Sequence, residues 1–261
     1  MKRKIIISVL ILLIIIFLNL ILSMISNINT ENVKLYFLRL NDADCSIIKY
    51  KENVIMIDTG EKKDREKIIQ KMKKLKIMNI DYLILTHPDK DHIGNAKYLL
   101  EKFNVKTVIQ TDYDKQNNTQ KEINKIITNI GVENLILKER KVVNVAELEM
   151  EIYPPEKQYE DSNNNSLIVL LKYKDKRVLY TGDIREERMI DIMEDFQKVD
   201  VLKYPYHGRK NIYSQQFIER TQPKFAIITG TEPDETIIES LNKIKSKIRL
   251  TNEQEVEITL K

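Results

Sequence analysis

The chain has 261 residues, a formal net charge of +4 at neutral pH, three histidines and one cysteine. Removing the basic residues Lys2, Arg3 and Lys4 leaves a charge of only +1, which excludes the general basic surface of a strong nucleic-acid-binding protein. The lone Cys45 excludes an internal disulfide, and it neither supports nor excludes an extracellular location.

The first predicted element is an apolar segment over residues 5–25 that contains no charged side chain. About twenty apolar residues suffice to cross the hydrocarbon core of a membrane as a helix. Basic residues before the segment and Glu31 after it favour a cytoplasmic N-terminus and an extracytoplasmic remainder. A cleaved signal peptide is the competing interpretation, although the segment is long and residues 22–26 form a poor cleavage site. We therefore predict a single-pass protein of the cell membrane, with residues 1–30 as a transmembrane anchor and residues 31–261 as the working domain.

From residue 33 onwards, short apolar runs typical of strands alternate with charged stretches of helical periodicity. In chain order we predict strands over 35–40, 46–50 and 54–57, a helix over 62–76, a strand over 81–86, a helix over 94–103, a strand over 105–110 and a helix over 120–130. The second half continues with strands over 142–145, 148–153, 167–172 and 177–181, a helix over 186–197, a strand over 201–205, a helix over 213–220, a strand over 225–229, a helix over 234–247 and a strand over 255–260. This order predicts an α/β fold with a two-sheet core and helices outside it. We interpret the charged face of the 62–76 helix as solvated rather than as a binding patch.

All three histidines lie in segments suited to holding a metal ion. The loop after one buried strand contains His87, Asp89, Asp91 and His92 within six positions, and His207 follows a later strand. Neutral imidazole is a common ligand of transition metals, and carboxylates supply hard oxygen donors beside it. A solvated polar turn is the competing interpretation of the loop.

A further carboxylate, Asp183, follows Gly182 at the end of another predicted strand. Loops at strand ends hold their side chains rigidly. A tight loop can also direct neighbouring donors toward two metal positions about 3.5–4 Å apart, the separation typical of two-metal hydrolases.

Six segments occur in a fixed order along residues 33–261. They are Leu-Asn-Asp-Ala-Asp at 40–44, Ile-Asp-Thr-Gly at 57–60, Thr-His-Pro-Asp-Lys-Asp-His-Ile-Gly at 86–94, Asn-Asn-Ser-Leu-Ile-Val-Leu at 164–170, Thr-Gly-Asp at 181–183 and Lys-Tyr-Pro-Tyr-His-Gly at 203–208. In these segments the chain resembles the metallo-β-lactamase superfamily, and more closely the hydrolase domain of the ComEC-type competence proteins of DNA uptake and their stand-alone relatives. The resemblance implies a four-layer αββα sandwich and a metal-dependent hydrolase.

The resemblance also implies a role for each matching side chain. The implied ligands of one ion are His87 and Asp89, those of a second ion are Asp91, His92 and His207, and Asp183 bridges the two. Of these, Asp91, Asp183 and His207 are the expected catalytic residues. Asp58 and Asp44 are expected to orient ligands from behind, with local hydrogen bonding in turns as the alternative.

Some positions depart from the pattern of the family. Asp89 replaces a histidine of the wider superfamily, residues 161–166 offer no third-motif histidine, and Tyr206 stands where the competence branch usually has the first of two histidines. Oxygen-rich coordination shifts metal preference from Zn²⁺ toward Mn²⁺ or Mg²⁺, so we expect one or two ions of Zn²⁺ or Mn²⁺. Three basic residues near His207 are expected to be solvent-exposed, with attraction of a phosphate as the alternative: Lys203, Arg209 and Lys210.

The expected function is that of a membrane-anchored phosphodiesterase or nuclease acting on DNA or a small phosphoester. The near-neutral working domain argues against tight binding of a duplex, but single-stranded DNA or a small phosphoester needs less basic surface. Two alternatives stay open: a hydrolase of a lactone, thioester or β-lactam, and a degenerate, non-catalytic anchored module. The sequence makes no prediction of the oligomeric state.

Overall fold

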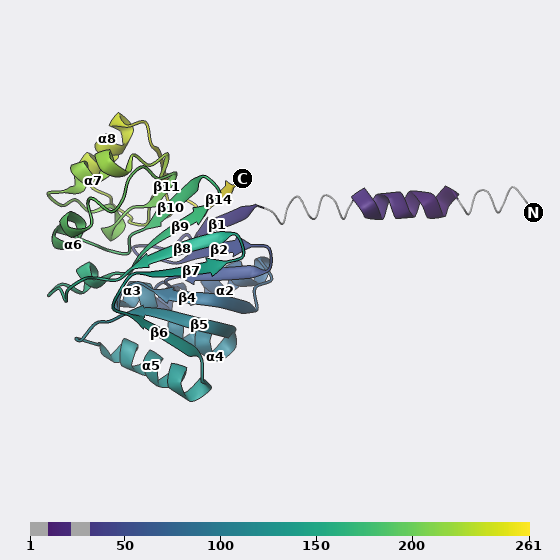
Figure 1. Cartoon of the computed structure of the whole chain (residues 1–261), viewed down its shortest axis with the longest axis horizontal. Coiled ribbons are helices and arrows are strands. Elements are labelled where there is room, and N and C mark those ends of the chain that lie inside the picture. Colours follow the sequence, from purple (N-terminus) through teal and green to yellow (C-terminus); the bar gives the residue numbers. More distant parts are fainter. Residues whose placement is uncertain (1–9, 22–31) are drawn as a thin grey trace, which may run out of the picture.

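Two seven-stranded sheets lie against each other in the computed structural model, which describes residues 10–21 and 32–261 (Figure 1). The first sheet has the order β14 (Val256–Leu260), β1 (Val33–Phe37), β2 (Ser46–Tyr50), β3 (Asn53–Ile57), β4 (Asn79–Leu85), β5 (Asn104–Thr111) and β6 (Glu133–Leu137). The second has the order β13 (Lys247–Leu250), β12 (Phe225–Ile228), β11 (Val201–Lys203), β10 (Lys176–Tyr180), β9 (Ile168–Tyr173), β8 (Leu148–Tyr153) and β7 (Lys141–Val145). The strand β14 pairs antiparallel with β1, so that Val33 lies opposite Leu260.

Helices cover the outer face of each sheet (Figure 1). On the first sheet they are α2 (Arg65–Lys74), α3 (Lys90–Ile93), α4 (Ala96–Lys102) and α5 (Asn118–Ile130). On the second they are α6 (Glu186–Asp191), α7 (Ser214–Thr221) and α8 (Glu235–Lys243). Short 3-10 helices occupy Lys62–Asp64, Ser162–Asn165 and Tyr206–Gly208.

Three apolar layers hold these elements together. Successive side chains of a strand point to opposite faces of its sheet. In β11, Val201 therefore lies between the two sheets, whereas Leu202 packs against the outer helices. In β3, Ile55 lies between the sheets and Val54 packs beneath the helices of the first sheet. The predicted α/β sandwich with two inner sheets and outer helices is confirmed.

Parallel strand pairs determine where the polar loops lie. In the first sheet β3 pairs with β4 in parallel, with Ile57 opposite Ile84. In the second sheet β10 pairs with β11 in parallel, with Tyr180 opposite Lys203. Because the carboxyl ends of parallel strands meet at the same edge, the loops that follow each pair leave their sheet together.

Most predicted strands and helices are present with ends shifted by a few residues, but two helices are shorter than predicted. The edge strands β6 and β13 and the short helix α3 were not predicted. The helix predicted over 186–197 ends at Asp191, and the helix predicted over 234–247 ends at Lys243.

The N-terminal segment is described only in part. Residues 10–21 form a helix whose apolar side chains are exposed. The predicted span over 5–25 and the predicted boundary at residue 30 extend into residues 1–9 and 22–31, which lie outside the described residues. Within 10–21 and 32–261, no helix is both long and apolar enough to cross a membrane. The transmembrane anchor therefore stays a prediction.

Candidate metal centre

Asp58 connects the ends of β3 and β4 and orients one histidine. Its carboxylate is buried, and its backbone is left-handed with φ of 60°. The backbone N–H of Thr86 donates to Oδ1 at 2.8 Å, and the Thr86 hydroxyl donates to Oδ2 at 2.7 Å. Oδ2 also lies 2.7 Å from Nδ1 of His92. A proton on Nδ1 leaves the lone pair of His92 Nε2 facing away from Asp58, a geometry that suits the orienting role predicted for this carboxylate.

Four predicted ligands come together on the other side of His92. Asp91, His92, Asp183 and His207 each offer a ligand atom within 4.8 Å of the other three. Oδ2 of Asp183 lies 3.3 Å from Nε2 of His92 and 3.0 Å from Nε2 of His207. Oδ2 of Asp91 lies 3.7 Å and 3.2 Å from the same two nitrogens. Residues from both sheets thus share one site. Asp91 and His92 follow β4 of the first sheet, whereas Asp183 follows β10 and His207 follows β11 of the second.

His207 is held in place by an unusual local backbone. Its φ is 52°, and the next residue, Gly208, has a φ of 86°. A Cβ on Gly208 would lie 2.7 Å from Cγ2 of Ile228, so the turn accepts only glycine at that position. The turn directs His207 Nδ1 to the hydroxyl of Thr229 at 2.9 Å, which leaves Nε2 directed at the carboxylates.

His87 and Asp89 lie beside this cluster rather than within it. The ring centroids of His87 and His92 are 4.0 Å apart, and His87 Nε2 lies 3.8 Å from Oδ2 of Asp89. The segment that lacks the third-motif histidine contacts both residues. Ser166 Oγ lies 3.2 Å from Nδ1 of His87, and the Ser162 hydroxyl donates to Asp89 at 2.9 Å. The structure therefore brings four of the six predicted ligands into one group and places the other two next to it.

Lys203 contradicts the prediction that it is solvent-exposed, whereas Arg209 and Lys210 are exposed as predicted. Lys203 is only 3% exposed. Its ammonium contacts the carboxylate of Asp44 and lies 3.2 Å from Oδ1 of Asp183. It also donates to the carbonyl of Gly182 at 3.0 Å. Side chains two residues apart on a strand point to the same face of the sheet. Lys203 is therefore buried on the face of Val201, which lies between the two sheets.

Asp44 lies behind the imidazoles and is buried as well. Its Oδ1 is 3.6 Å from Nδ1 of His207, and its Oδ2 is 3.9 Å from Nδ1 of His92. Of the two predicted roles, these contacts favour a place in the site over local hydrogen bonding in a turn. Lys203 and Asp44 thus form a charged layer behind the cluster.

The residues present fit a divalent cation. Within the described part of the chain, Nε2 of His87 and Nε2 of His92 are buried and have no hydrogen-bond partner. A buried polar atom without a partner is costly unless a ligand satisfies it. The imidazole nitrogens of His92 and His207 and the carboxylates of Asp91 and Asp183 make a mixed donor set. Such a set suits Zn²⁺ or Mn²⁺ without selecting between them.

The comparisons with known proteins agree with this geometry. A family model described as "Metallo-beta-lactamase superfamily" matches residues 38–230. The chain belongs to the metallo-β-lactamase superfamily. Together with the Asp/His cluster, this membership makes the protein a metal-dependent hydrolase of the superfamily.

Two curated proteins are similar to part of the chain. ComE operon protein 3 of Bacillus subtilis (strain 168) is 30% identical over 189 residues, which are 68% of this chain and 24% of that protein. Recombination protein 2 of Haemophilus influenzae is 25% identical over 181 residues, which are 66% of this chain and 21% of that protein. The chain thus spans about a quarter or less of the length of these relatives. Among solved structures, the metallo-β-lactamase fold protein YhfI from Bacillus subtilis matches 88% of this chain and 100% of its own length with a TM-score of 0.62 at 10% identity, which shows the fold alone.

Without a cation, protons and Lys203 balance the carboxylates of this superfamily site. Burial opposes a charge on His207, but Asp183 and Asp91 outweigh it and raise the pKa of His207 to about 9. Burial likewise opposes a charge on His92, and there Asp183 and Asp58 raise the pKa well above its ordinary value. Burial also works against ionised Asp91, but the two imidazoles lower its pKa to about 2. Both histidines are therefore protonated at neutral pH when no ion is bound.

Metal affinity is expected to rise with pH. A ligand nitrogen must lose its proton before it binds an ion. The pKa of His207 is raised to about 9 and that of His92 well above its ordinary value, so both nitrogens carry a proton at neutral pH. Affinity should therefore increase with pH by about tenfold per pH unit for each proton displaced, until each imidazole has lost its proton. Titration calorimetry with Mn²⁺ or Zn²⁺, in buffers of different ionisation enthalpy, measures the protons released. A pH-independent affinity with no proton release would contradict this assignment of the imidazoles.

Sequence reasoning missed several residues that support the ligands of the superfamily site. They are Thr86, Ser166, Lys203 and Thr229. All four lie within two residues of a strand end, which is the one signal that could have found them.

Proposed function

We propose that the protein is a phosphodiesterase or nuclease that acts on DNA or a small phosphoester. The observation that carries this proposal is the convergence of Asp91, His92, Asp183 and His207 at the meeting edges of two sheets. A divalent cation bound there supplies a Lewis acid for a phosphoryl oxygen and an activated water as nucleophile.

The residues of the chain fix the geometry for that chemistry. Asp58 holds His92, and Thr229 holds His207, so that both Nε2 atoms face the same carboxylates. The side chain of Asp91 is 25% exposed, against 3% for that of Asp183, so it is the group of the cluster that meets an incoming substrate or water. With its lowered pKa, Asp91 is a carboxylate at neutral pH and can orient a water by accepting its hydrogen bond at Oδ2.

Positive charge beside the cluster favours a phosphoester over a lactone, thioester or β-lactam. Tyr206, the residue before His207, is half-buried with the guanidinium groups of Arg185 and Arg209 each 4.9 Å from its ring centroid. Arg185 also pairs with Asp161 at 2.7 Å, whereas Arg209 is exposed. Guanidinium groups recognise phosphate oxygens through paired hydrogen bonds.

The curated relatives support a nucleic-acid substrate. One is named as a recombination protein, and recombination acts on DNA. The other is the product of the ComE operon, in line with the competence-type motifs of the sequence. Since the chain spans only a quarter or less of each relative, the proposal concerns the hydrolase domain and not DNA transport.

The decisive test is turnover by the full chain purified in detergent and loaded with Mn²⁺ or Zn²⁺. We expect hydrolysis of single-stranded DNA, of bis(p-nitrophenyl) phosphate or of both, and we expect EDTA to abolish it. A metal-replete sample without turnover of either substrate would refute the proposal. Elemental analysis of the same sample separates the non-catalytic alternative, for which little or no metal is expected.

Anchoring at the cell membrane, with the hydrolase domain outside the cytoplasm, is part of the same proposal. It is supported by the apolar run over residues 5–25 and by the basic residues before it. The measurement is fractionation of cells that express the full chain, followed by protease treatment of intact protoplasts. Recovery of the chain in the soluble fraction, or its protection from external protease, would refute this part.

A further inference from the structure

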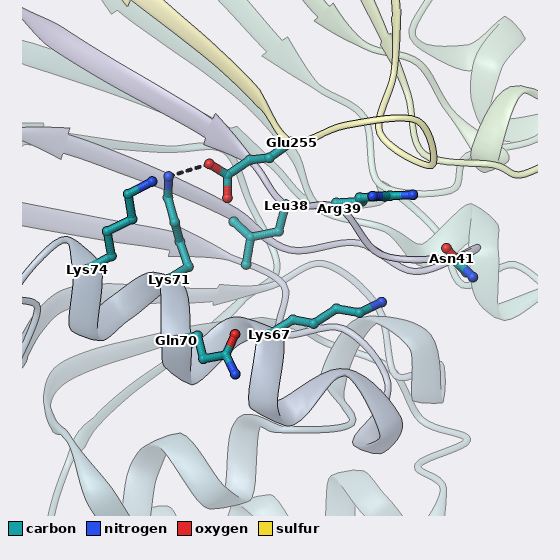
Figure 2. A pocket seen from close by; sticks show the side chains of 8 residues that line it. All are labelled: Leu38, Arg39, Asn41, Lys67, Gln70, Lys71, Lys74 and Glu255. Atoms are coloured by element: carbon teal, nitrogen blue, oxygen red, sulfur yellow. Dashed lines mark hydrogen bonds and ion pairs between the residues drawn. The ribbon is translucent and has the colours of Figure 1, made fainter.

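A groove of about 560 Å³ lies between α2 and the segment that follows β1 (Figure 2). Its lining residues are Leu38, Arg39, Asn41, Lys67, Gln70, Lys71, Lys74 and Glu255. We propose that this groove binds the sugar-phosphate backbone of a single-stranded nucleic acid and leads the strand to the metal centre. The inference rests on the proposed function, because it assigns a binding surface to the substrate of that same site.

One face of α2 supplies most of the positive charge. Lys67, Gln70, Lys71 and Lys74 follow the spacing that places side chains on a single face of a helix. Lys67, Gln70 and Lys74 are exposed, in agreement with the sequence-based interpretation of a solvated face, and the same face forms one wall of the groove. Arg39 contributes a further guanidinium from the opposite wall, and in Figure 2 it extends toward the end of the groove marked by Asn41.

The lysines of the groove fall into two kinds. Lys71 is buried, pairs with Glu255, and holds its ammonium 3.9 Å from the ring centroid of Tyr36. It therefore neutralises the one acid of the groove and supports the fold. Lys67 and Lys74 are exposed. Lys67 lies 3.6 Å from the carboxylate of Asp64, whereas Lys74 has no ion-pair partner among the described residues. With Arg39, these two exposed lysines give the groove three cations that a ligand can reach.

The groove ends at a loop that reaches the metal centre. Asn41 lines the groove, and Asp44, three residues later, contacts Lys203 and lies 3.6 Å from the ring of His207. A chain advances at most ~3.6 Å per residue, so Asn41 and Asp44 are no more than about 11 Å apart at their Cα atoms. The loop is held in place because Asp42 accepts hydrogen bonds from the backbone and hydroxyl of Thr231, at 2.9 and 2.7 Å. The Asn41 end of the groove therefore lies close to the charged layer behind the cluster, at a distance that a few nucleotides span.

The chemistry of the lining selects the class of ligand. None of the residues that line the groove in the described chain is aromatic, so bases have no stacking platform and the contacts go to phosphates. Three cations in a recess suit one flexible strand better than a duplex, consistent with the near-neutral charge of the domain. A lipid surface, in contrast, is recognised by clusters of four to eight basic residues at a surface that faces the bilayer.

The test is equilibrium binding of a fluorescent oligothymidylate to the full chain in detergent with EDTA, measured by anisotropy. Lys67→Gln combined with Lys74→Gln is expected to weaken binding by at least about tenfold. For a single strand the slope of log affinity against log salt is about 0.7 per phosphate contact, so losing two contacts should reduce its magnitude by about 1.4. The matched control is Lys121→Gln combined with Lys125→Gln, which removes two exposed lysines from α5 and is expected to change neither quantity. Lys74→Gln alone, with about half the change in slope, serves if the double variant does not fold.

Each outcome decides between the groove and the proposed function. Unchanged oligonucleotide affinity in the groove variant, or an equal loss in the α5 control, overturns the groove even if the wild type hydrolyses phosphodiesters. Binding that depends on the groove lysines in a protein without hydrolytic activity upholds the groove and refutes the function. If the groove substitutions leave oligonucleotide binding intact but abolish retention on phosphatidylserine nanodiscs, the groove serves lipid headgroups and the proposal is wrong.

Discussion

Asp183→Ala is expected to remove hydrolytic activity and bound metal together. The Oδ2 atom of Asp183 lies within 3.3 Å of the Nε2 atoms of both His92 and His207, so the carboxylate is the central oxygen donor of the cluster. Loss of a residue that only orients a ligand typically costs ~10–100-fold in metal affinity, and loss of a ligand should exceed that range. The measurements are elemental analysis after desalting and turnover of bis(p-nitrophenyl) phosphate.

Two further variants control this experiment. Asp175→Ala removes a carboxylate from an exposed turn between β9 and β10, and it should retain both metal and activity. Asp183→Asn keeps the shape of the side chain but not its charge, and should lose most of its metal. Activity of Asp183→Ala at the wild-type level, with metal still bound, would show that the assignment of ligands is wrong.

Lys203→Met is expected to destabilise the metal-free protein by about 3–5 kcal/mol. Burial opposes the charge of the Lys203 ammonium, but Asp44 and Asp183 raise its pKa above the ordinary value, so the group is a buried cation that balances two buried carboxylates. Methionine fills a similar volume and leaves both carboxylates without that cation. Denaturant unfolding in EDTA measures the change in the free energy of unfolding.

The same experiment has an internal check. Lys203→Met combined with Asp44→Asn removes one charge of each sign and should recover part of the lost stability, because fewer carboxylates remain uncompensated. Saturating Mn²⁺ should also recover part of it, since a cation at the cluster replaces the missing positive charge. If Lys203→Met unfolds at the wild-type denaturant concentration in EDTA, the ammonium does not have the electrostatic role assigned to it.

The candidate site was largely predictable because its residues stand where apolar strands end. Asp58, His87 and Asp183 each follow a run of strand residues, and parallel strands carry such positions to a common edge. The spacing of these residues in the sequence could not show which of them share one metal position and which lie beside it. The structure groups Asp91 and His92 with Asp183, whereas His87 lies to one side, and this division depends on the path of the loop.

The burial of Lys203 depends on a tertiary contact that the local sequence does not show. Alternation places Lys203 on the same face of β11 as Val201, which lies between the two sheets. Whether an ammonium is tolerated there depends on Asp44, which comes from a distant loop on the other sheet. No local feature of the sequence carries that information.

The misplaced end of the last helix has a similar cause. Ile237, Leu241, Ile244 and Ile248 continue the spacing of an amphipathic helix, and all four pack against the same apolar cluster. The chain nevertheless leaves the helix after Lys243, and Ile248 reaches that cluster from β13. A helix and an edge strand that bury apolar residues against one layer produce a continuous pattern, so the boundary between them is not visible in the sequence.

The pairing of β14 with β1 has a consequence for how this domain can be built into larger proteins. Val33 and Leu260 are opposite each other on neighbouring strands, so the first and last strands of the folded unit lie side by side. A domain with adjacent ends can be inserted into a loop of another polypeptide without stretching either side. The same architecture is therefore suited both to carriage on a short tether and to residence inside a chain several times its length.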